Sequence, residues 1–425
     1  MLDRKATPPV RDTVDLNLSL KPYEKYTLNN GVPVYAVNAG AESVLVLELN
    51  FKAGNNFDSQ NLEAYAANHL LKNGTTQRSA FEINEHFDYY GAYLSRSCQN
   101  ETANITLHCL SKHLPKLLHV IRDLVTDSIY PEQELDIFVK NHKQQLSVNL
   151  LKCEFIANRL NDVYLYGEAH PYAKFSSNAD YDALNVDQLK AFYGKYYLNG
   201  SCTIFTAGQL PDNFFALLDE NFGDLSIGNK IIIPEFIAQP AIQKKFRIDN
   251  DPEGVQGAIR LSRPFPNRHH PDFKNAIILN TLFGGFFGSR LMNNIREEKG
   301  YTYGISSYLQ NHIQQSAWVI STEAGKTVCE DTIKEVYKEM QLLREEPVDT
   351  EELLLVKNYL MGSYLGDLDG PFQIIARWKN LILNNLDESY FYNSMQAIKN
   401  ISETDIQSLA NRYLQPEDFY ELVVV

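Results

Sequence analysis

The sequence predicts an α+β fold built from two homologous halves in tandem, each an antiparallel-rich sheet with helices packed on it. Strand and helix patterns follow one another in the same order twice, short sequence stretches recur at matching places, and a proline-containing joint separates the two parts. The 425 residues suit a chain of two or three domains, since a domain averages about 150 residues. We therefore expect a first half over residues 1–225, a linker over 226–243 and a second half over 244–425.

The first half is expected to open with strands. Asn29-Asn30-Gly31 favours a tight turn between strands over 26–28 and 32–37. Alternating apolar residues over 44–51 predict a further strand with one buried face. Helices then follow over about 61–73, 80–90, 114–126 and 132–149, with a strand pair over about 92–98 and 103–110 between the second and third of them. A helix that ends at Tyr196-Tyr197-Leu198 and a strand over 202–207 close the half.

The second half repeats this order. Its expected elements are strands over about 256–263, 302–309 and 317–323, helices over about 271–282, 328–343 and 350–365, and a short helix that ends near Glu298. The stretch from Glu352-Leu353 to Val356-Lys357-Asn358 echoes the stretch from Glu134-Leu135 to Val139-Lys140-Asn141. A helix that ends at Tyr413-Leu414 and a strand over 420–425 close this half as well. The repetition indicates an internal duplication.

Composition and charge narrow the functional classes. Lys and Arg number 39 against 53 Asp and Glu, a formal charge of −14, which argues against nucleic acid or an anionic membrane as a partner. The 44% hydrophobic content is that of a folded globular chain. No apolar run approaches the roughly 18 residues of a membrane span, and no secretory signal follows Met1. The five scattered cysteines fit free thiols, so a cytoplasmic location is expected.

Several motifs occur together in one order along nearly the whole chain. They are Leu71-Lys72-Asn73-Gly74-Thr75, His170-Pro171-Tyr172, Phe192-Tyr193 with Tyr196-Tyr197, and the stretch from Gly284-Gly285 through Ser289-Arg290-Leu291 and Ile295-Arg296-Glu297 to Tyr301-Thr302-Tyr303-Gly304. In this order the chain resembles the pitrilysin/insulinase-like zinc metallopeptidases, specifically the short-chain subgroup related to mitochondrial processing peptidase. The resemblance implies two α+β halves and a zinc-dependent peptidase ancestry.

Active members of that family carry H-x-x-E-H on the first helix, where two His bind Zn²⁺ and the Glu acts as general base. Here the window reads Tyr65-Ala66-Ala67-Asn68-His69, so Tyr65 replaces the first His and Asn68 replaces the general base. The third ligand of the family is a Glu from a later helix, but no Asp or Glu occurs between Asp136 and Glu154. One imidazole cannot hold catalytic zinc, so we expect no metal on this chain and a buried or interface role for His69.

A zinc site elsewhere is not favoured by the spacing of the other histidines. None of His86, His108, His113, His119 and His142 pairs with another at i, i+4 on one helix. His269-His270 are adjacent in a loop flanked by prolines, and no G-x-S-x-G motif supports serine catalysis. The glycines at 284, 285 and 288 lack phosphate-loop spacing, which favours close backbone packing as their role.

The second-half motif is intact. In the family subgroup an Arg, and a Tyr seven residues later, contact the bound peptide beside the zinc, and Arg296 and Tyr303 match these positions. Arg296 offers a fork of donors to peptide carbonyls or a carboxylate, and the Tyr303 hydroxyl can donate to a scissile carbonyl as negative charge develops. The alternative is structural: Arg296 pairs with Glu297 or Glu298, and Tyr303 packs in the sheet.

The resemblance therefore implies a non-catalytic, peptide-binding subunit of a heteromeric zinc peptidase, inactive alone, that supplies Arg296 and Tyr303 to the zinc site of a homologous partner. Zinc is expected on that partner, and the expected ligand is a peptide held by strand addition at a sheet edge. A second hypothesis is a structural or peptide-binding relative without proteolytic role that forms a homodimer. An independently active zinc peptidase is the third and least favoured.

Overall fold

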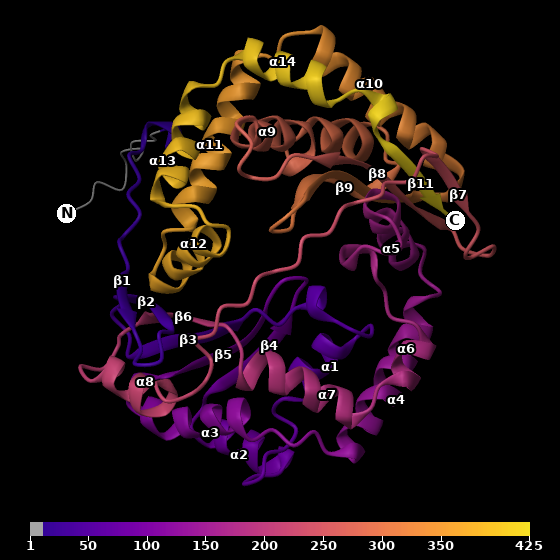
Figure 1. Ribbon diagram of the computed structural model, residues 1–425. Coiled ribbons are helices and arrows are strands. Elements are labelled where there is room, and N and C mark those ends of the chain that lie inside the picture. The colour runs from indigo at the N-terminus through magenta and orange to yellow at the C-terminus, as the bar shows by residue number, and fades with distance from the viewer. Residues whose placement is uncertain (1–11) are drawn as a thin grey trace.

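The structure is a computed structural model that describes residues 12–425, and it contains two sheets that face each other in two halves of the molecule (Figure 1). The first sheet has the strand order β1-β2-β6-β3-β5-β4, and the second has the order β7-β11-β8-β10-β9. The strands of the first sheet are β1 (Glu24–Thr27), β2 (Pro33–Asn38), β3 (Val44–Phe51), β4 (Tyr93–Cys98), β5 (Ala103–Leu110) and β6 (Cys202–Gly208). Those of the second are β7 (Lys245–Ile248), β8 (Gln256–Phe265), β9 (Thr302–Asn311), β10 (Ser316–Gly325) and β11 (Tyr420–Val424).

The two sheets share one topology. When β1 is set aside, each sheet has five strands in the same order, with one parallel pair near one edge and antiparallel pairs elsewhere. The parallel pairs are β2 with β6 and β7 with β11. The predicted α+β class and the duplication of one unit are therefore confirmed, and β1 is an addition that only the first sheet carries.

Helices cover the outer face of each sheet (Figure 1). The first half contributes α1 (Glu63–Leu70), α2 (Ala80–Tyr89), α3 (Leu114–Thr126), α4 (Glu132–Asn149), α5 (Cys153–Tyr166), α6 (Asn178–Ala183), α7 (Val186–Tyr193) and α8 (Phe214–Phe222). The second contributes α9 (Phe273–Asn280), α10 (Cys329–Glu345), α11 (Thr350–Gly366), α12 (Pro371–Leu383), α13 (Glu388–Asn400) and α14 (Glu403–Tyr413). These helices bury two large apolar cores, and the core of the second half also includes Val37, Val46, Phe205 and Ala207 of the first sheet. Among the described residues, no helix combines the length and the apolar character needed to cross a bilayer.

The first predicted helix is shorter than expected, and its start has a local cause. The Asp58 carboxylate accepts hydrogen bonds from the backbone N–H groups of Leu62 (3.2 Å) and Ala64 (2.7 Å), which fixes the beginning of α1. Burial raises the pKa of Asp58 to about 7, although these two hydrogen bonds act in the opposite direction. In the second half, the helix predicted over 271–282 ends as α9 at Asn280, and a π-helical turn over Thr281–Gly285 continues it.

The halves exchange equivalent helices. In the first half α5 packs on β8 and β11 of the second sheet, and in the second half α12 packs on β2 and β6 of the first sheet (Figure 1). The ring of Tyr164 on α5 stacks on Phe246 with centroids 3.6 Å apart, and Arg260 on β8 donates to Asn158 Oδ1 at 2.8 Å. On α12, the Trp378 indole donates to the carbonyl of Lys21 at 2.8 Å. Each sheet is therefore contacted by one helix that belongs to the other half of the chain.

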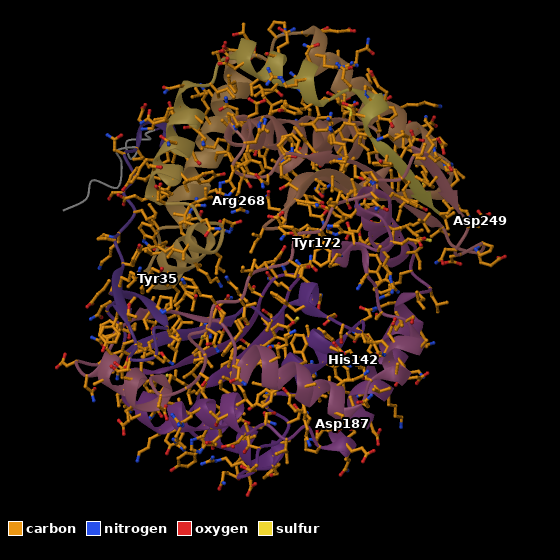
Figure 2. The ribbon with its side chains drawn as sticks, viewed as in Figure 1. Tyr35, His142, Tyr172, Asp187, Asp249 and Arg268 are labelled. Atoms are coloured by element: carbon orange, nitrogen blue, oxygen red, sulfur yellow. The ribbon has the colours of Figure 1, made fainter. Side chains whose placement is uncertain are left out.

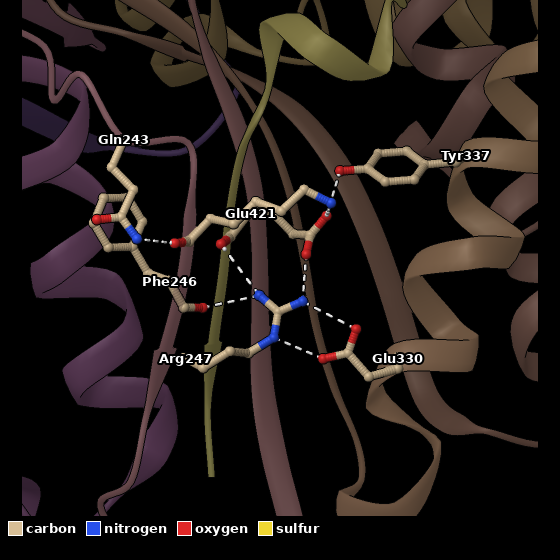
Figure 3. A network of polar contacts seen from close by, with 7 residues as sticks. Gln243, Phe246, Arg247, Glu330, Tyr337 and Glu421 are labelled. Atoms are coloured by element: carbon tan, nitrogen blue, oxygen red, sulfur yellow. Dashed lines mark hydrogen bonds and ion pairs between the residues drawn. The ribbon is translucent and has the colours of Figure 1, made fainter.

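A polar network anchors β7, the first strand after the linker (Figure 3). The Arg247 guanidinium binds both oxygens of Glu330, at 2.6 Å and 3.0 Å, and also pairs with Glu421 on β11. The second oxygen of Glu421 accepts the Tyr337 hydroxyl at 2.8 Å and lies 3.2 Å from Lys245 Nζ. This network joins β7 to β11 and α10, so the parallel strand pair of the second half is held by charge as well as by its backbone hydrogen bonds.

Candidate functional site

The helix that carries Tyr65, Asn68 and His69 lies against β4 and α7, and these three residues have different surroundings. Tyr65 and His69 are half-buried on the side that faces α4, whereas Asn68 is 2% exposed and contacts β5 and Tyr197 instead. This split follows from helical geometry, because positions four apart share a face and position 68 points about a quarter turn away from 69.

Tyr65 and His69 meet His142 of α4. The Tyr65 hydroxyl lies 3.2 Å from His142 Nε2, and His142 Nδ1 lies 2.9 Å from the Phe138 carbonyl. Because a carbonyl only accepts, Nδ1 carries the proton and Nε2 accepts from Tyr65. The His69 ring completes the cluster, with its centroid 5.2 Å from that of His142 and 5.0 Å from that of Phe138. A hydrogen-bonded aromatic cluster thus occupies the positions that resemble the metal site of the family.

The positive charges around this cluster disfavour the binding of a cation. Burial, and after it the charge of Arg96, the nearby His142 and the charge of Lys72, together lower the pKa of His69 to about 4. The Arg96 guanidinium also donates to the His69 carbonyl. The neighbourhood of His69 is therefore positive, and its imidazole is neutral near pH 7.

These residues do not fit a zinc ion. Both ring nitrogens of His142 are already hydrogen-bonded, and the remaining donors at the cluster are one imidazole and one phenol. Across residues 12–425, no three or more His, Cys, Asp or Glu side chains come together in a way that could hold a metal. Catalytic zinc requires three protein ligands, so we derive no step through zinc bound to this chain.

Asn68 has become part of the core. Its amide donates to the Tyr197 hydroxyl at 3.1 Å and to the backbone carbonyl of Asn104 at 3.2 Å. The side chain therefore ties α1 to the start of β5 and to the turn after α7. An amide in this position cannot take a proton from a water molecule, and its hydrogen bonds give it a structural role.

Arg296 and Tyr303 lie at the surface of the second half. Arg296 belongs to a π-helical turn over Met292–Glu298, and Gly300 at φ +65° turns the chain into β9, where Tyr303 is 89% exposed. The Arg296 guanidinium lies over two rings, 4.7 Å from the centroid of Phe287 and 5.3 Å from that of Tyr303. The Arg296 Nε is 3.4 Å from Glu297, so the ion pair expected from the structural alternative is present. The packing expected for Tyr303 is not, because its side chain is exposed.

Two pockets lie near these elements. One, of about 320 Å³, is lined by Asp58, Tyr65 and His142 and by aromatic rings including Phe155 and Tyr181, so it opens beside the aromatic cluster. The other, of about 520 Å³, lies between the two halves, where the β4–β5 turn, the β9–β10 turn and α12 come together.

The contact between the halves next to the larger pocket includes residues that the sequence analysis did not assign to a site. Glu101 of the β4–β5 turn accepts the Tyr172 hydroxyl, and the Tyr172 ring lies 4.1 Å from that of His312 in the β9–β10 turn. Burial and the neighbouring His170 lower the pKa of His312 to about 4. The sequence analysis singled out the motif His170-Pro171-Tyr172. It could not identify Glu101 and His312, which contact Tyr172, because they are distant from the motif in sequence.

Comparison with known proteins identifies the family of the chain. The family model described as "Insulinase (Peptidase family M16)" matches residues 34–161, and the one described as "Peptidase M16 inactive domain" matches residues 183–360. The chain belongs to peptidase family M16. An uncharacterized zinc protease of Bacillus subtilis is 23% identical over 360 residues, which cover 83% of this chain and 86% of the relative.

Solved structures of bacterial proteins share the fold. A peptidase M16 inactive domain from Pseudomonas fluorescens superposes with a TM-score of 0.84 at 23% identity and covers 95% of this chain and 98% of that chain. A protease from Helicobacter pylori superposes with a TM-score of 0.85 at 17% identity, over 96% of this chain and 100% of that chain. At these identities the similarity shows a shared fold only. The chemistry of this M16 chain must be argued from its own residues.

The two family models divide the candidate residues between them. The insulinase model spans α1 with Tyr65, Asn68 and His69, and the inactive-domain model spans Arg296 and Tyr303. In this M16 chain the first region contains the aromatic cluster, and the second contains the half-buried Arg296 and the exposed Tyr303. The search for histidines at i, i+4 spacing did not pair His142 with His69, because His69 lies on α1 and His142 lies on α4.

Proposed function

We propose that this M16 chain is a non-catalytic, peptide-binding subunit of a heteromeric zinc metallopeptidase and that it supplies Arg296 and Tyr303 to the zinc site of a homologous partner. One contrast supports this most. Tyr65 of the motif helix is hydrogen-bonded to His142 of α4, whereas Tyr303 is 89% exposed beside an arginine held between two rings. In this proposal the chain has lost the residues that hold a metal and kept those that donate hydrogen bonds.

The chemistry proposed for the pair follows from its geometry. Within the described part of the chain the Arg296 guanidinium makes one ion pair, to Glu297 through Nε, so its two terminal nitrogens can donate in a planar fork to peptide carbonyls or to a carboxylate. Flanking rings limit the rotamers of Arg296 and reduce the entropy lost when it binds. Tyr303 offers a hydroxyl that can stabilise the negative charge on a carbonyl oxygen under attack at the zinc of the partner.

An extended peptide can be held at the free edge of a sheet. β4 and β9 are edge strands, each with one row of backbone groups that no other described strand pairs. Main-chain pairing at such an edge tolerates many sequences, which suits a peptidase subunit that does not itself select the cleavage site.

The experiment combines the purified chain with a homologous M16 chain that carries an intact H-x-x-E-H motif and follows cleavage of a fluorogenic peptide. We expect no cleavage by this chain alone, cleavage by the mixture, and a loss of roughly 100-fold in kcat on Arg296→Ala or Tyr303→Phe. Arg412→Ala and Tyr89→Phe are matched controls on exposed residues elsewhere and leave the rate unchanged. A mixture that keeps its full rate with Arg296→Ala and Tyr303→Phe combined contradicts the proposed role.

A second experiment tests the competing hypothesis of a structural, homodimeric relative. Affinity purification from the native host, followed by mass determination of the intact complex, gives the composition of the assembly. Recovery of a zinc-bearing M16 homologue supports the heteromeric proposal. Recovery of this chain with itself alone, as a symmetric dimer without peptidase activity, favours the structural role instead.

A further inference from the structure

We propose that the cavity between the two halves binds a small hydroxylated anion and that Arg268 pairs with the carboxylate or phosphate group of this ligand. The cavity has a volume of about 520 Å³, which lies in the range of small-molecule sites. Arg268, labelled in Figure 2, lines it from the second half. Neither Arg296 nor Tyr303 is among the described residues of the lining, so this inference is independent of the proposed function.

Arg268 carries a charge that its surroundings do not neutralise. Its Nη1 donates to the neutral amide oxygen of Asn380, and within the described part of the chain no carboxylate forms an ion pair with Arg268. The neighbouring Arg377, by contrast, pairs with Asp367 at 2.9 Å. Burial lowers the pKa of Arg268, while the Tyr390 hydroxyl opposes this effect and the charge of Arg377 adds to it. A partly desolvated guanidinium without an acidic partner is stabilised by an anion.

The terminal nitrogens of Arg268 are available to such an anion. Nη2 makes no hydrogen bond to the described residues and is not buried, whereas Nε is buried. Nη1 carries two N–H groups and uses one of them for Asn380. Because a guanidinium binds carboxylate and phosphate oxygens best through two parallel N–H donors, Nη1 and Nη2 can together hold the acidic group of a ligand.

Asparagine side chains of the lining match a ligand that carries hydroxyl groups. Asn104 accepts the Ser97 backbone N–H at 3.2 Å through Oδ1, which leaves its Nδ2 as a donor. Asn384 donates to the Asn380 carbonyl at 2.7 Å through Nδ2, which leaves its Oδ1 as an acceptor. Among the described residues neither atom has another hydrogen-bond partner. A hydroxyl both donates and accepts, so one half offers a donor and the other an acceptor to a polyol.

The other charged groups of the lining do not cancel the charge of Arg268. Lys379 pairs with Glu48 at 2.8 Å, so these two charges offset each other. Burial raises the pKa of Glu101, which shifts this carboxyl toward its neutral form, and its oxygen accepts the Tyr172 hydroxyl. The charge of the lining that lacks a close partner is therefore positive, although the formal charge of the whole chain is −14.

The lining also limits the kind of anion. No Phe, Tyr or Trp occurs among its described residues, so it offers no such ring for stacking with a nucleobase. The aliphatic side chains among these residues are Ile313, Ala376 and Leu383, which provide little apolar surface for a fatty acid. A compact ligand with several hydroxyls and an acidic group, such as a sugar phosphate or a hydroxy acid, suits this lining.

Isothermal titration calorimetry with the full chain tests this assignment. Glucose 6-phosphate offers a phosphate, citrate offers carboxylates beside a hydroxyl, and glucose offers hydroxyls without charge. We expect one-to-one binding of glucose 6-phosphate or of citrate, and the anion that binds shows which acidic group the cavity takes. Glucose should bind roughly tenfold more weakly or not at all, because it cannot pair with the guanidinium.

Three variants connect the binding to the cavity. Arg268→Gln removes the charge and should weaken binding of the anion roughly tenfold or more. Ala376, an exposed residue of α12, lines the cavity, and Ala376→Phe should weaken binding to a similar degree by filling the space without removing a polar group. Arg412→Gln is the matched control, because Arg412 is exposed and pairs with Asp272 elsewhere. Thermal melts show whether each variant retains the fold, and Ala376→Phe carries the test if Arg268→Gln does not fold.

The inference is overturned if neither anion binds the wild-type chain, or if glucose binds as tightly as glucose 6-phosphate. Unchanged affinity with Ala376→Phe, or with a folded Arg268→Gln, overturns it as well. The cleavage assay with Arg296→Ala reports on the proposed function alone, so failure of one proposal is distinguishable from failure of the other.

Discussion

Replacing Glu421 by glutamine tests the network that anchors β7 (Figure 3). The Glu421 side chain is 3% exposed, pairs with Arg247, accepts the Tyr337 hydroxyl at 2.8 Å and lies 3.2 Å from Lys245. Glutamine keeps one oxygen, but its amide nitrogen must face a donor, so one charge-assisted hydrogen bond is lost and a positive side chain loses its buried partner. These losses sum to about 3 kcal/mol of unfolding free energy.

The pH dependence of this loss has a definite sign. Burial alone raises the pKa of Glu421, but the hydrogen bonds from Arg247 and Tyr337 outweigh it and hold the pKa below its usual value. A carboxyl with a lowered pKa in the folded state stabilises the fold above its unfolded pKa of about 4.3, and that contribution is lost as the pH falls through the folded pKa. The stability difference between wild type and Glu421→Gln should therefore be full at pH 7 and shrink below about pH 4.

Urea denaturation of both proteins from pH 3 to pH 8, followed by circular dichroism, measures this difference. Glu330→Gln is the matched control, because Glu330 pairs with the same arginine but is 59% exposed. Exposed ion pairs contribute about 0–1 kcal/mol, so this control should change stability little. If Glu421→Gln loses no more stability than Glu330→Gln at pH 7, or if its loss is the same at pH 3 and pH 8, the reasoning is refuted.

Three further outcomes follow from the contacts around the two sites. Tyr172→Phe removes the hydroxyl that donates to the buried Glu101 side chain within the first half and should cost roughly 2 kcal/mol in urea denaturation; a cost near zero would mean that this hydrogen bond does not stabilise the fold. Asn68→Leu removes two hydrogen bonds of a buried side chain, one of them to Tyr197, and should cost about 2 kcal/mol; equal stability of variant and wild type would be the contrary result. NMR titration of His69 should give a midpoint near pH 4, and a midpoint near 6.5 would show that its ring is not desolvated.

Much of the fold could be predicted from the sequence because periodicity and turn residues act locally. The strand pair of each half and the turn at Gly300 follow from such signals. The exchange of α5 and α12 could not be predicted, because an apolar helix face does not specify which of two similar sheets it covers. The shortened start of α1 depends on a carboxylate, Asp58, that accepts from the helix backbone and that apolar spacing does not register.

The candidate site was predictable only in part for the same reason. Tyr65, Asn68 and His69 could be aligned with a known motif, but the partner of Tyr65 is His142 on another helix. The i, i+4 rule concerns one helix, so it cannot find histidines that meet between two. Phe287, which lies against Arg296, is likewise nine residues away in sequence and comes close only because the chain between them turns.

Zinc titration of the purified chain most directly tests the central claim, that the motif helix no longer holds a metal while the chain retains Arg296 and Tyr303. Calorimetry would report stoichiometry, and anomalous diffraction at the zinc edge from crystals soaked in zinc would locate any bound ion. We predict no one-to-one tight binding and no anomalous peak beside His69 and His142. A stoichiometric zinc ion coordinated by either ring would contradict the account.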